Sequence, residues 1–325
     1  MTSIQNFLSY GDRILDRTSF KNGDRSTVKY QLLTAFMSKL EDQFTIHFWG
    51  VRGSIACPGA ATVRYGGNTP CVEMLVGGYR LIFDAGTGIH VLGRSLLGDL
   101  SVSGHLFFSH SHWDHIQGFP FFSPAFMEGN EFDIYGGVIP HGVTIEHRLH
   151  DQMNQPNFPV PLQVMGANLR FHNLDYGDRV NLGDVTISTG ALNHPGGAMG
   201  YRVSWRDYVV AYITDTEHFS DIDRNVLELA DRADVLIYDS TYTDQEYYHP
   251  QTSKIGWGHS TWQEGVKVAQ AAQVKKLVIF HHDPTHDDEF MDAIELQSQQ
   301  VFAGSIVARE GMEILVSESV SIANL

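Results

Sequence analysis

The chain has 325 residues, of which 42% are hydrophobic, and its formal net charge at pH 7 is −16. That length allows one large domain or two small ones, and the hydrophobic share is ordinary for a globular core. The chain has only 22 Lys and Arg residues and no basic cluster, so extensive nucleic-acid binding is not expected, and its two cysteines exclude a disulfide framework.

The first 43 residues differ from the rest of the chain. They lack the basic start and apolar core of a secretory signal, and no stretch reaches the ~18 apolar residues of a membrane helix, so a cytoplasmic protein is expected. Apolar residues recur four apart at Val28, Leu32, Phe36 and Leu40, which predicts an amphipathic helix. We therefore expect a helical extension over 1–43 that packs on its own domain, with a lid or a homodimer contact as the alternatives.

From residue 44 onward, short β-rich apolar runs are separated by glycines. Several runs, including LIFDAG (81–86) and VLIYDS (235–240), lead into an Asp or His, and strand ends are where α/β folds place their chemistry. Helical periodicity is confined to the segments 89–100, 223–233, 261–273 and 288–301. Many strands with few helices predict two sheets covered by helices, a four-layer α/β domain over 44–325.

A dense group of metal-type ligands follows one apolar run, in the motif HSHWDH at 110–115. His110 and His112 alternate at a strand end, so their side chains can share one metal ion. Asp114 and His115 lie past the turn and can face a second ion. Imidazole mixed with carboxylate is typical of catalytic rather than structural metal sites.

Three more ligand-type residues follow later apolar runs. His194 follows VTISTGALN, Asp215 follows YVVAYIT, and His281 follows KKLVIF. His282 competes with His281, which is preferred because it stands directly at the strand end. Together with the HSHWDH motif, these positions predict a two-metal site.

With these motifs, the sequence resembles the metallo-β-lactamase fold superfamily over residues 44–316. The resemblance implies an αββα sandwich that binds two divalent metal ions, with zinc preferred and manganese or iron as alternatives. The ligands implied for the two metals are His110, His112 and His194 for the first, Asp114, His115 and His281 for the second, and Asp215 as a bridge between them. The resemblance also implies that Asp84, in LIFDAGTG, orients a ligating histidine.

Further motifs resemble one branch of that superfamily, which contains ribonuclease Z and phosphodiesterases. True β-lactamases of this fold have a cysteine at the position of Asp215, so lactam hydrolysis is not expected. The motifs YDSTY (238–242) and GHST (258–261) imply that His259 meets the scissile phosphate or the leaving oxygen and that Asp239 orients it. Asn68, in GGNT, is expected to line the site.

The favoured function is hydrolysis of a small phosphodiester, such as a cyclic nucleotide. The alternatives are a ribonuclease Z-like endoribonuclease and a thioesterase or iron oxygenase on the same scaffold. The short interval from His194 to Asp215 leaves no space for the long tRNA-gripping arm that the ribonucleases insert there. The aromatic segments 119–126 and 157–162 are candidates for a wall around the substrate, although packing onto the core is favoured for both.

Overall fold

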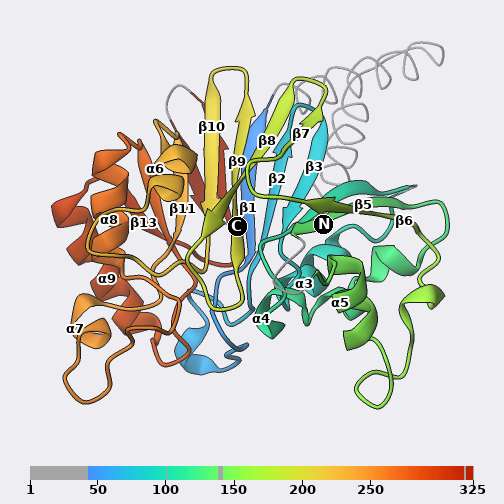
Figure 1. Cartoon of the computed structure of the whole chain (residues 1–325), viewed down its shortest axis with the longest axis horizontal. Coiled ribbons are helices and arrows are strands. Elements are labelled where there is room, and N and C mark those ends of the chain that lie inside the picture. The colour runs from blue at the N-terminus through green and yellow to red at the C-terminus, as the bar shows by residue number, and fades with distance from the viewer. Residues whose placement is uncertain (1–42, 100, 138–141, 318–319, 325) are drawn as a thin grey trace, which may run out of the picture.

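The strands form two sheets, and the structure, a computed structural model, describes residues 43–99, 101–137, 142–317 and 320–324 (Figure 1). The first sheet has eight strands, in the order β15 (Ser321–Asn324), β14 (Met312–Val316), β1 (Phe44–Gly50), β2 (Cys71–Val76), β3 (Tyr79–Phe83), β4 (Ser103–Phe108), β5 (Glu131–Gly137), β6 (Asn168–Leu174). The second has seven, in the order β13 (Ser305–Val307), β12 (Lys276–Phe280), β11 (Val235–Asp239), β10 (Tyr208–Ile213), β9 (Ala198–Trp205), β8 (Val185–Leu192), β7 (Arg179–Leu182). The helical extension predicted for 1–43 lies outside the described residues, apart from residue 43.

The main core lies between the two sheets. On β1, the alternating residues Phe44, Ile46 and Phe48 are fully buried, and they pack with residues of the second sheet such as Val203 and Tyr212. Strand β11 is buried along its whole length because helices cover its other face. A strand covered fully on one face, such as β1, alternates between buried and partly buried residues, whereas a strand covered on both faces, such as β11, is apolar throughout most of its length.

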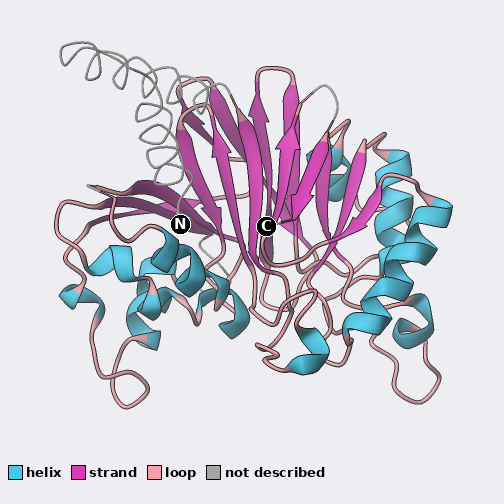
Figure 2. Cartoon of the chain, turned by 180° about the vertical axis from the view of Figure 1, so that it is seen from behind, coloured by secondary structure: helices cyan, strands magenta, loops and turns pink. Residues whose placement is uncertain are grey.

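Helices form the two outer layers (Figure 2). Those on the second sheet are α6 (Arg224–Ala230), α8 (Trp262–Ala271) and α9 (Asp288–Val301). Those on the first sheet are α3 (Gly88–Ser95) and α5 (Ile145–Gln152). The predicted four-layer αββα sandwich is confirmed. None of the described helices is long and apolar enough to cross a membrane.

Some elements were not expected from the sequence. The edge strands β6 and β7 expose much of their length, so they lack the apolar runs that mark the central strands. The short helices α4 (Trp113–Ile116) and α7 (Asp244–Tyr247) are single turns, too short for a helical period. All four predicted helical segments within 44–325 do form helices, although α3 ends at Ser95, before the predicted end at 100.

Candidate metal centre

The predicted ligands meet at one edge of the two sheets, because they follow strands whose carboxyl ends face the same way. Strands β3, β4 and β5 are parallel in the first sheet, and β10, β11 and β12 are parallel in the second. The ligands that follow β4, β8, β10 and β12 are His110, His194, Asp215 and His281. Parallel strands therefore bring together residues that are far apart in the sequence.

The first cluster contains the three histidines predicted for one metal. His110, His112, His194 and Asp215 each offer one ligand atom within 4.8 Å of the others. The Nε2 atoms of His110 and His194 each lie 3.6 Å from Oδ2 of Asp215, and His194 Nε2 lies 3.0 Å from His112 Nδ1. This arrangement converges on one point, as a metal site requires.

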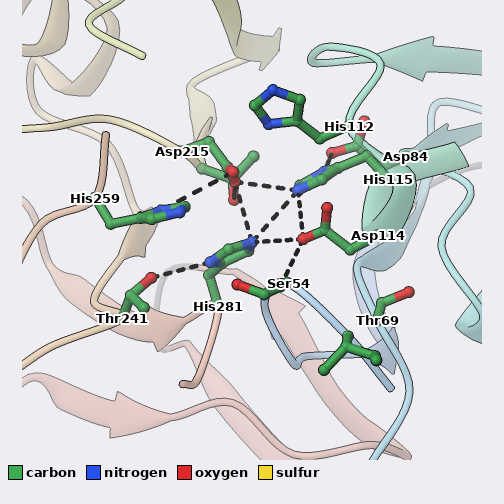
Figure 3. A network of polar contacts seen from close by, with 12 residues as sticks. Ser54, Thr69, Asp84, His112, Asp114, His115, Asp215, Thr241, His259 and His281 are labelled. Carbon is green, nitrogen blue, oxygen red and sulfur yellow. Dashed lines mark hydrogen bonds and ion pairs between the residues drawn. The ribbon is translucent and has the colours of Figure 1, made fainter. Parts of the chain in front are cut away.

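The second cluster contains Asp114, His115 and His281, again within 4.8 Å of one another (Figure 3). Oδ2 of Asp114 lies 3.3 Å from His115 Nε2 and 3.2 Å from His281 Nε2. Oδ1 of Asp215 lies 3.2 Å and 3.3 Å from the same two nitrogens. Asp215 therefore turns one oxygen to each cluster, which is the geometry of a bridging carboxylate.

The backbone at the site is held in a conformation that L residues rarely adopt. Asp84, Asp215 and His281 have φ angles of 60°, 53° and 63°, and Ser54, whose N–H donates to Asp114 Oδ2 at 2.7 Å, has 63°. Non-glycine residues in this region cost roughly 1–3 kcal/mol each and are characteristic of functional sites. Here the left-handed turn aims each side chain back across the strand ends.

The residues present fit divalent cations. Four carboxylates, those of Asp84, Asp114, Asp215 and Asp239, are buried together at the sheet edge. Buried charges are paired or bind metals, and the cavity that opens onto this site has no Lys or Arg among its lining residues. His110 Nε2 is buried and has no hydrogen-bond partner among the described residues. A bound cation would satisfy both the unpaired nitrogen and the excess negative charge.

The electrostatics of the site agree with that fit. Burial lowers the pKa of His110 well below its ordinary value, so its imidazole is neutral, the form that binds metals. Burial alone would raise the pKa of Asp215, but the charges of His115 and His281 outweigh it and hold that pKa well below its usual range. Burial alone would lower the pKa of His115, but the negative charges of Asp215, Asp114 and Asp84 outweigh it and raise that pKa. The carboxylates thus stay ionised, which is the form in which they bind metal ions.

Asp84 occupies the orienting position predicted for it. Its Oδ2 accepts a hydrogen bond from His115 Nδ1 at 2.8 Å and another from the Ser109 hydroxyl at 2.8 Å. The Ser109 oxygen in turn lies 3.0 Å from His110 Nδ1. Tyr212 also donates to Asp84, at 2.8 Å. One buried acid therefore fixes a histidine of each cluster, the first through Ser109 and the second directly.

Asp239 and His259 form the predicted pair. His259 Nδ1 lies 2.9 Å from Asp239 Oδ2, and its ring stacks on that of His281 at 4.9 Å between centroids. Burial lowers the pKa of His259, but Asp239 and Asp215 outweigh that effect and raise it to about 9. His259 also lies within 4.8 Å of Asp215, Asp239 and His281 as a group that could hold an ion. The same Nδ1 lies 4.0 Å from Asp215 Oδ2, so Asp239 is the nearer of its two carboxylate partners.

The structure distinguishes the two adjacent histidines after β12. The ring of His281 lies in the second cluster, whereas His282 Nε2 binds the carbonyl of Ala308 at 2.9 Å. For Asn68, lining of the site stays a prediction. Its side-chain amide donates to Glu310 at 2.9 Å, and it is not among the residues that line the cavity. Its backbone carbonyl accepts hydrogen bonds from the N–H groups of Val51 and Arg52, so Asn68 holds the backbone that leads to Ser54.

Glu217 is a site residue that sequence reasoning missed. Its carboxylate accepts hydrogen bonds from the Tyr247 hydroxyl at 2.6 Å and from the backbone N–H groups of Gly256 and Gly258 at 2.6 Å and 3.0 Å. The Gly258 carbonyl then accepts from His194 Nδ1 at 2.7 Å. A Cβ on Gly258 would lie 2.4 Å from that nitrogen, so this close approach requires glycine. Glu217 thus fixes the loop that carries His259.

A cavity of about 390 Å³ opens onto both clusters. Its lining residues are Ser54, Ser111, His112, Trp113, Asp114, Asp215 and His259. The aromatic segments 119–126 and 157–162, the candidates for a substrate wall, contribute none of these. Phe119 and Phe122 are fully buried in the core beneath α3, so the first segment mainly packs, as favoured. The aromatic side chain in the cavity is Trp113, which is 83% exposed.

The comparisons with known proteins agree with this geometry. A family model described as "Beta-lactamase superfamily domain" matches residues 79–282. A ribonuclease Z from Picrophilus torridus is 23% identical, over 86% of this chain and 98% of the relative. The fold is similar to that of a diphosphatase from the PhnP family (TM-score 0.61, 17% identity, 86% of this chain and 100% of the other). It is also similar to human tRNase Z, short form (TM-score 0.57, 18% identity, 85% and 99%).

Proposed function

The chain belongs to the beta-lactamase superfamily, and from that premise we propose that it is a dinuclear metal-dependent phosphodiesterase that acts on a small substrate. The observation that carries the proposal is the Asp239–His259 pair, 2.9 Å apart, beside a carboxylate whose two oxygens face the two ligand clusters. An acid–base histidine next to two cations matches the needs of a phosphodiester, which has a charged centre and a poor leaving group.

The proposed ligands divide as the clusters do. His110, His112 and His194 would hold one ion and Asp114, His115 and His281 the other, with Asp215 shared. Two bound divalent ions supply an activated water and neutralise charge on the phosphoryl group. The chain's own contribution is to hold these imidazoles in the correct orientation, through Asp84, Ser109 and the Gly258 carbonyl.

His259 is the proposed proton donor to the leaving oxygen. Its Nδ1 is held by Asp239, so Nε2 is the nitrogen available to the substrate. The carboxylate of Asp239 favours the protonated imidazole that such a donor needs. As the P–O bond to the leaving group breaks, the Nε2 proton passes to the departing alkoxide, and Asp239 stabilises the ring in both protonation states.

Three observations support a small substrate. The 390 Å³ cavity falls in the range of small-molecule sites. Its lining residues include no Lys or Arg, which suits a singly charged diester better than a doubly charged monoester. Strands β9 and β10 form a hairpin in which Trp205 pairs with Tyr208 and two residues connect the strands. The chain from His194 to Asp215 therefore carries no long arm.

Ribonuclease Z-like cleavage of tRNA precursors is the second candidate. The similarity to a ribonuclease Z that spans 98% of that relative favours it. The net charge of −16 and the small cavity weigh against a large RNA footprint. The two candidates share the chemistry and differ in the size of the substrate.

A substrate panel on protein loaded with zinc, manganese or iron tests the proposal. It pairs bis(p-nitrophenyl) phosphate with p-nitrophenyl phosphate, a thioester, a chromogenic lactam and a tRNA precursor with a 3′ trailer. The proposal expects turnover of the diester and little of the monoester, with zinc as the preferred metal. Cleavage of the precursor with much higher kcat/KM than any small diester would favour the ribonuclease. Turnover of the thioester alone, or oxygen consumption by the iron form, would overturn both candidates.

A further inference from the structure

Trp113 occupies an unusual place for a tryptophan. It stands between His112 and Asp114, which belong to different ligand clusters, and it begins helix α4. Its side chain is 83% exposed, although tryptophan is usually among the most buried residues on average. No hydrogen bond or ring contact to its indole exists among the described residues. A large apolar surface is therefore held at the cavity without a structural partner.

The backbone around Trp113 is fixed even though the indole is exposed. The N–H of His115 binds the carbonyl of His112 at 3.0 Å, and that of Gln117 binds the carbonyl of Trp113 at 2.7 Å. The neighbouring Asp114 is held by Ser54 and His281. Because both flanking residues are tied into the site, a ring bound by the indole would sit at a defined place relative to the clusters.

The remaining cavity lining leaves few other ways to hold the organic part of a substrate. Besides the proposed metal ligands and His259, the lining residues are two serines and Trp113. With no Lys or Arg in the lining, the cavity offers an organic substituent the flat apolar surface of Trp113. Planar rings stack well on indole, and such stacking tolerates different bases.

We propose that Trp113 is a specificity-determining residue that stacks on a planar aromatic substituent of the phosphodiester, such as a nucleobase or an aryl group. This inference rests on the proposed function and names the substrate class for the same cavity. It gives the enzyme a preference for diesters whose non-leaving group is aromatic over diesters with a small alkyl group. The indole binds the substrate and takes no part in proton transfer.

Two substrates with the same leaving group isolate this effect. Thymidine 5′-(p-nitrophenyl phosphate) and methyl p-nitrophenyl phosphate both release p-nitrophenol and differ only in the non-leaving substituent. Trp113→Phe keeps an aromatic ring, whereas Trp113→Leu keeps an apolar side chain without one. Leu296→Ala is the control, because Leu296 is 64% exposed on the outer helix α9. Metal content is measured for each variant.

We expect Trp113→Leu to raise KM for the thymidine compound by about 5- to 100-fold, with kcat changed little. Trp113→Phe should recover most of that loss, and kcat/KM for the methyl compound should stay within about twofold in both variants. Equal losses on both substrates, or no change on either, would overturn the stacking role while the phosphodiesterase proposal stands. If the wild-type protein turns over neither compound but cleaves a thioester, the proposed function fails and the inference fails with it.

Discussion

Asp239 reaches His281 through the hydroxyl of Thr241. The Thr241 hydroxyl donates to Asp239 Oδ1 at 2.7 Å. Its oxygen lies 2.9 Å from His281 Nδ1, from which it accepts (Figure 3). The other oxygen of Asp239 holds His259. One buried acid therefore orients both the proposed proton donor and a proposed metal ligand, so the two functions are coupled through a single side chain.

Removing the Thr241 hydroxyl should weaken the binding of the second metal ion. Thr241→Val keeps the shape of the side chain but leaves His281 Nδ1 without its acceptor, and we expect the affinity for one ion to fall roughly 10- to 100-fold. Thr241→Ser retains the hydroxyl and should bind metal nearly as the wild type does. Competition with a chromogenic chelator measures both affinities. If the valine variant matched the serine variant, this relay would have no role in metal binding.

Replacing the shared carboxylate should have a larger effect. Asp215→Ala removes both oxygens that face the clusters, so we expect loss of one or both ions and of activity. Asp114→Ala should mainly empty the second cluster, because the three histidines of the first remain. Elemental analysis after dialysis gives the number of ions per chain. The exposed Asp231→Ala serves as the control, and two tightly held ions in Asp215→Ala would contradict the bridge.

Replacing His259 should lower turnover without changing metal content. We expect His259→Ala to lower kcat by roughly 10²–10⁴-fold, the usual contribution of a positioned acid or base. Asp239→Asn should lower it too, since the amide no longer stabilises the imidazolium. The loss should shrink for a nitrophenol leaving group, which needs little protonation.

The exposed His147→Ala is the matched control for His259→Ala. Steady-state kinetics on diesters with acidic and with alkyl leaving groups provide the comparison. Loss of an ion from His259→Ala would instead make that residue a ligand, as its place in the group with Asp215, Asp239 and His281 allows.

Glu217 should act on kcat through the loop it holds. Glu217→Ala leaves the N–H groups of Gly256 and Gly258 without their acceptor, so His259 and His194 lose their alignment. We expect kcat to fall about 10- to 100-fold with a smaller change in KM, because misplacing reacting groups costs that much. Glu217→Gln keeps an acceptor oxygen and should recover part of the loss. Equal effects of Glu217→Ala and of the exposed Glu228→Ala would show that the loop is held by other contacts.

The sequence predicts the ligand set because each ligand stands directly after a strand. The motif at 110–115 is contiguous, and His194, Asp215 and His281 each follow an apolar run, so the sequence marks all of them as candidates. Their division between two metals is what the family resemblance implies. The choice between His281 and His282 needed the structure. Both follow the same strand, and only the left-handed turn at His281 shows which ring enters the cluster.

Residues that act through tertiary contacts leave no such pattern. Thr241 and Glu217 lie in loops. Thr241 contacts His281, which is 40 residues away in the sequence, and Glu217 contacts Gly258, which is 41 residues away. The amide of Asn68 binds Glu310, which is distant in sequence, a contact that no motif indicates. No pattern in the sequence distinguishes Trp113 from a buried tryptophan, and its exposure is visible only in the fold.

The most direct test of the account is a metal titration of the apoprotein followed by turnover of bis(p-nitrophenyl) phosphate. The account predicts two zinc ions bound per chain and diester hydrolysis that depends on bound metal and is lost again on chelation. Binding of a single ion with full activity, or two ions with no hydrolysis of any phosphodiester, would contradict the claim of a dinuclear phosphodiesterase.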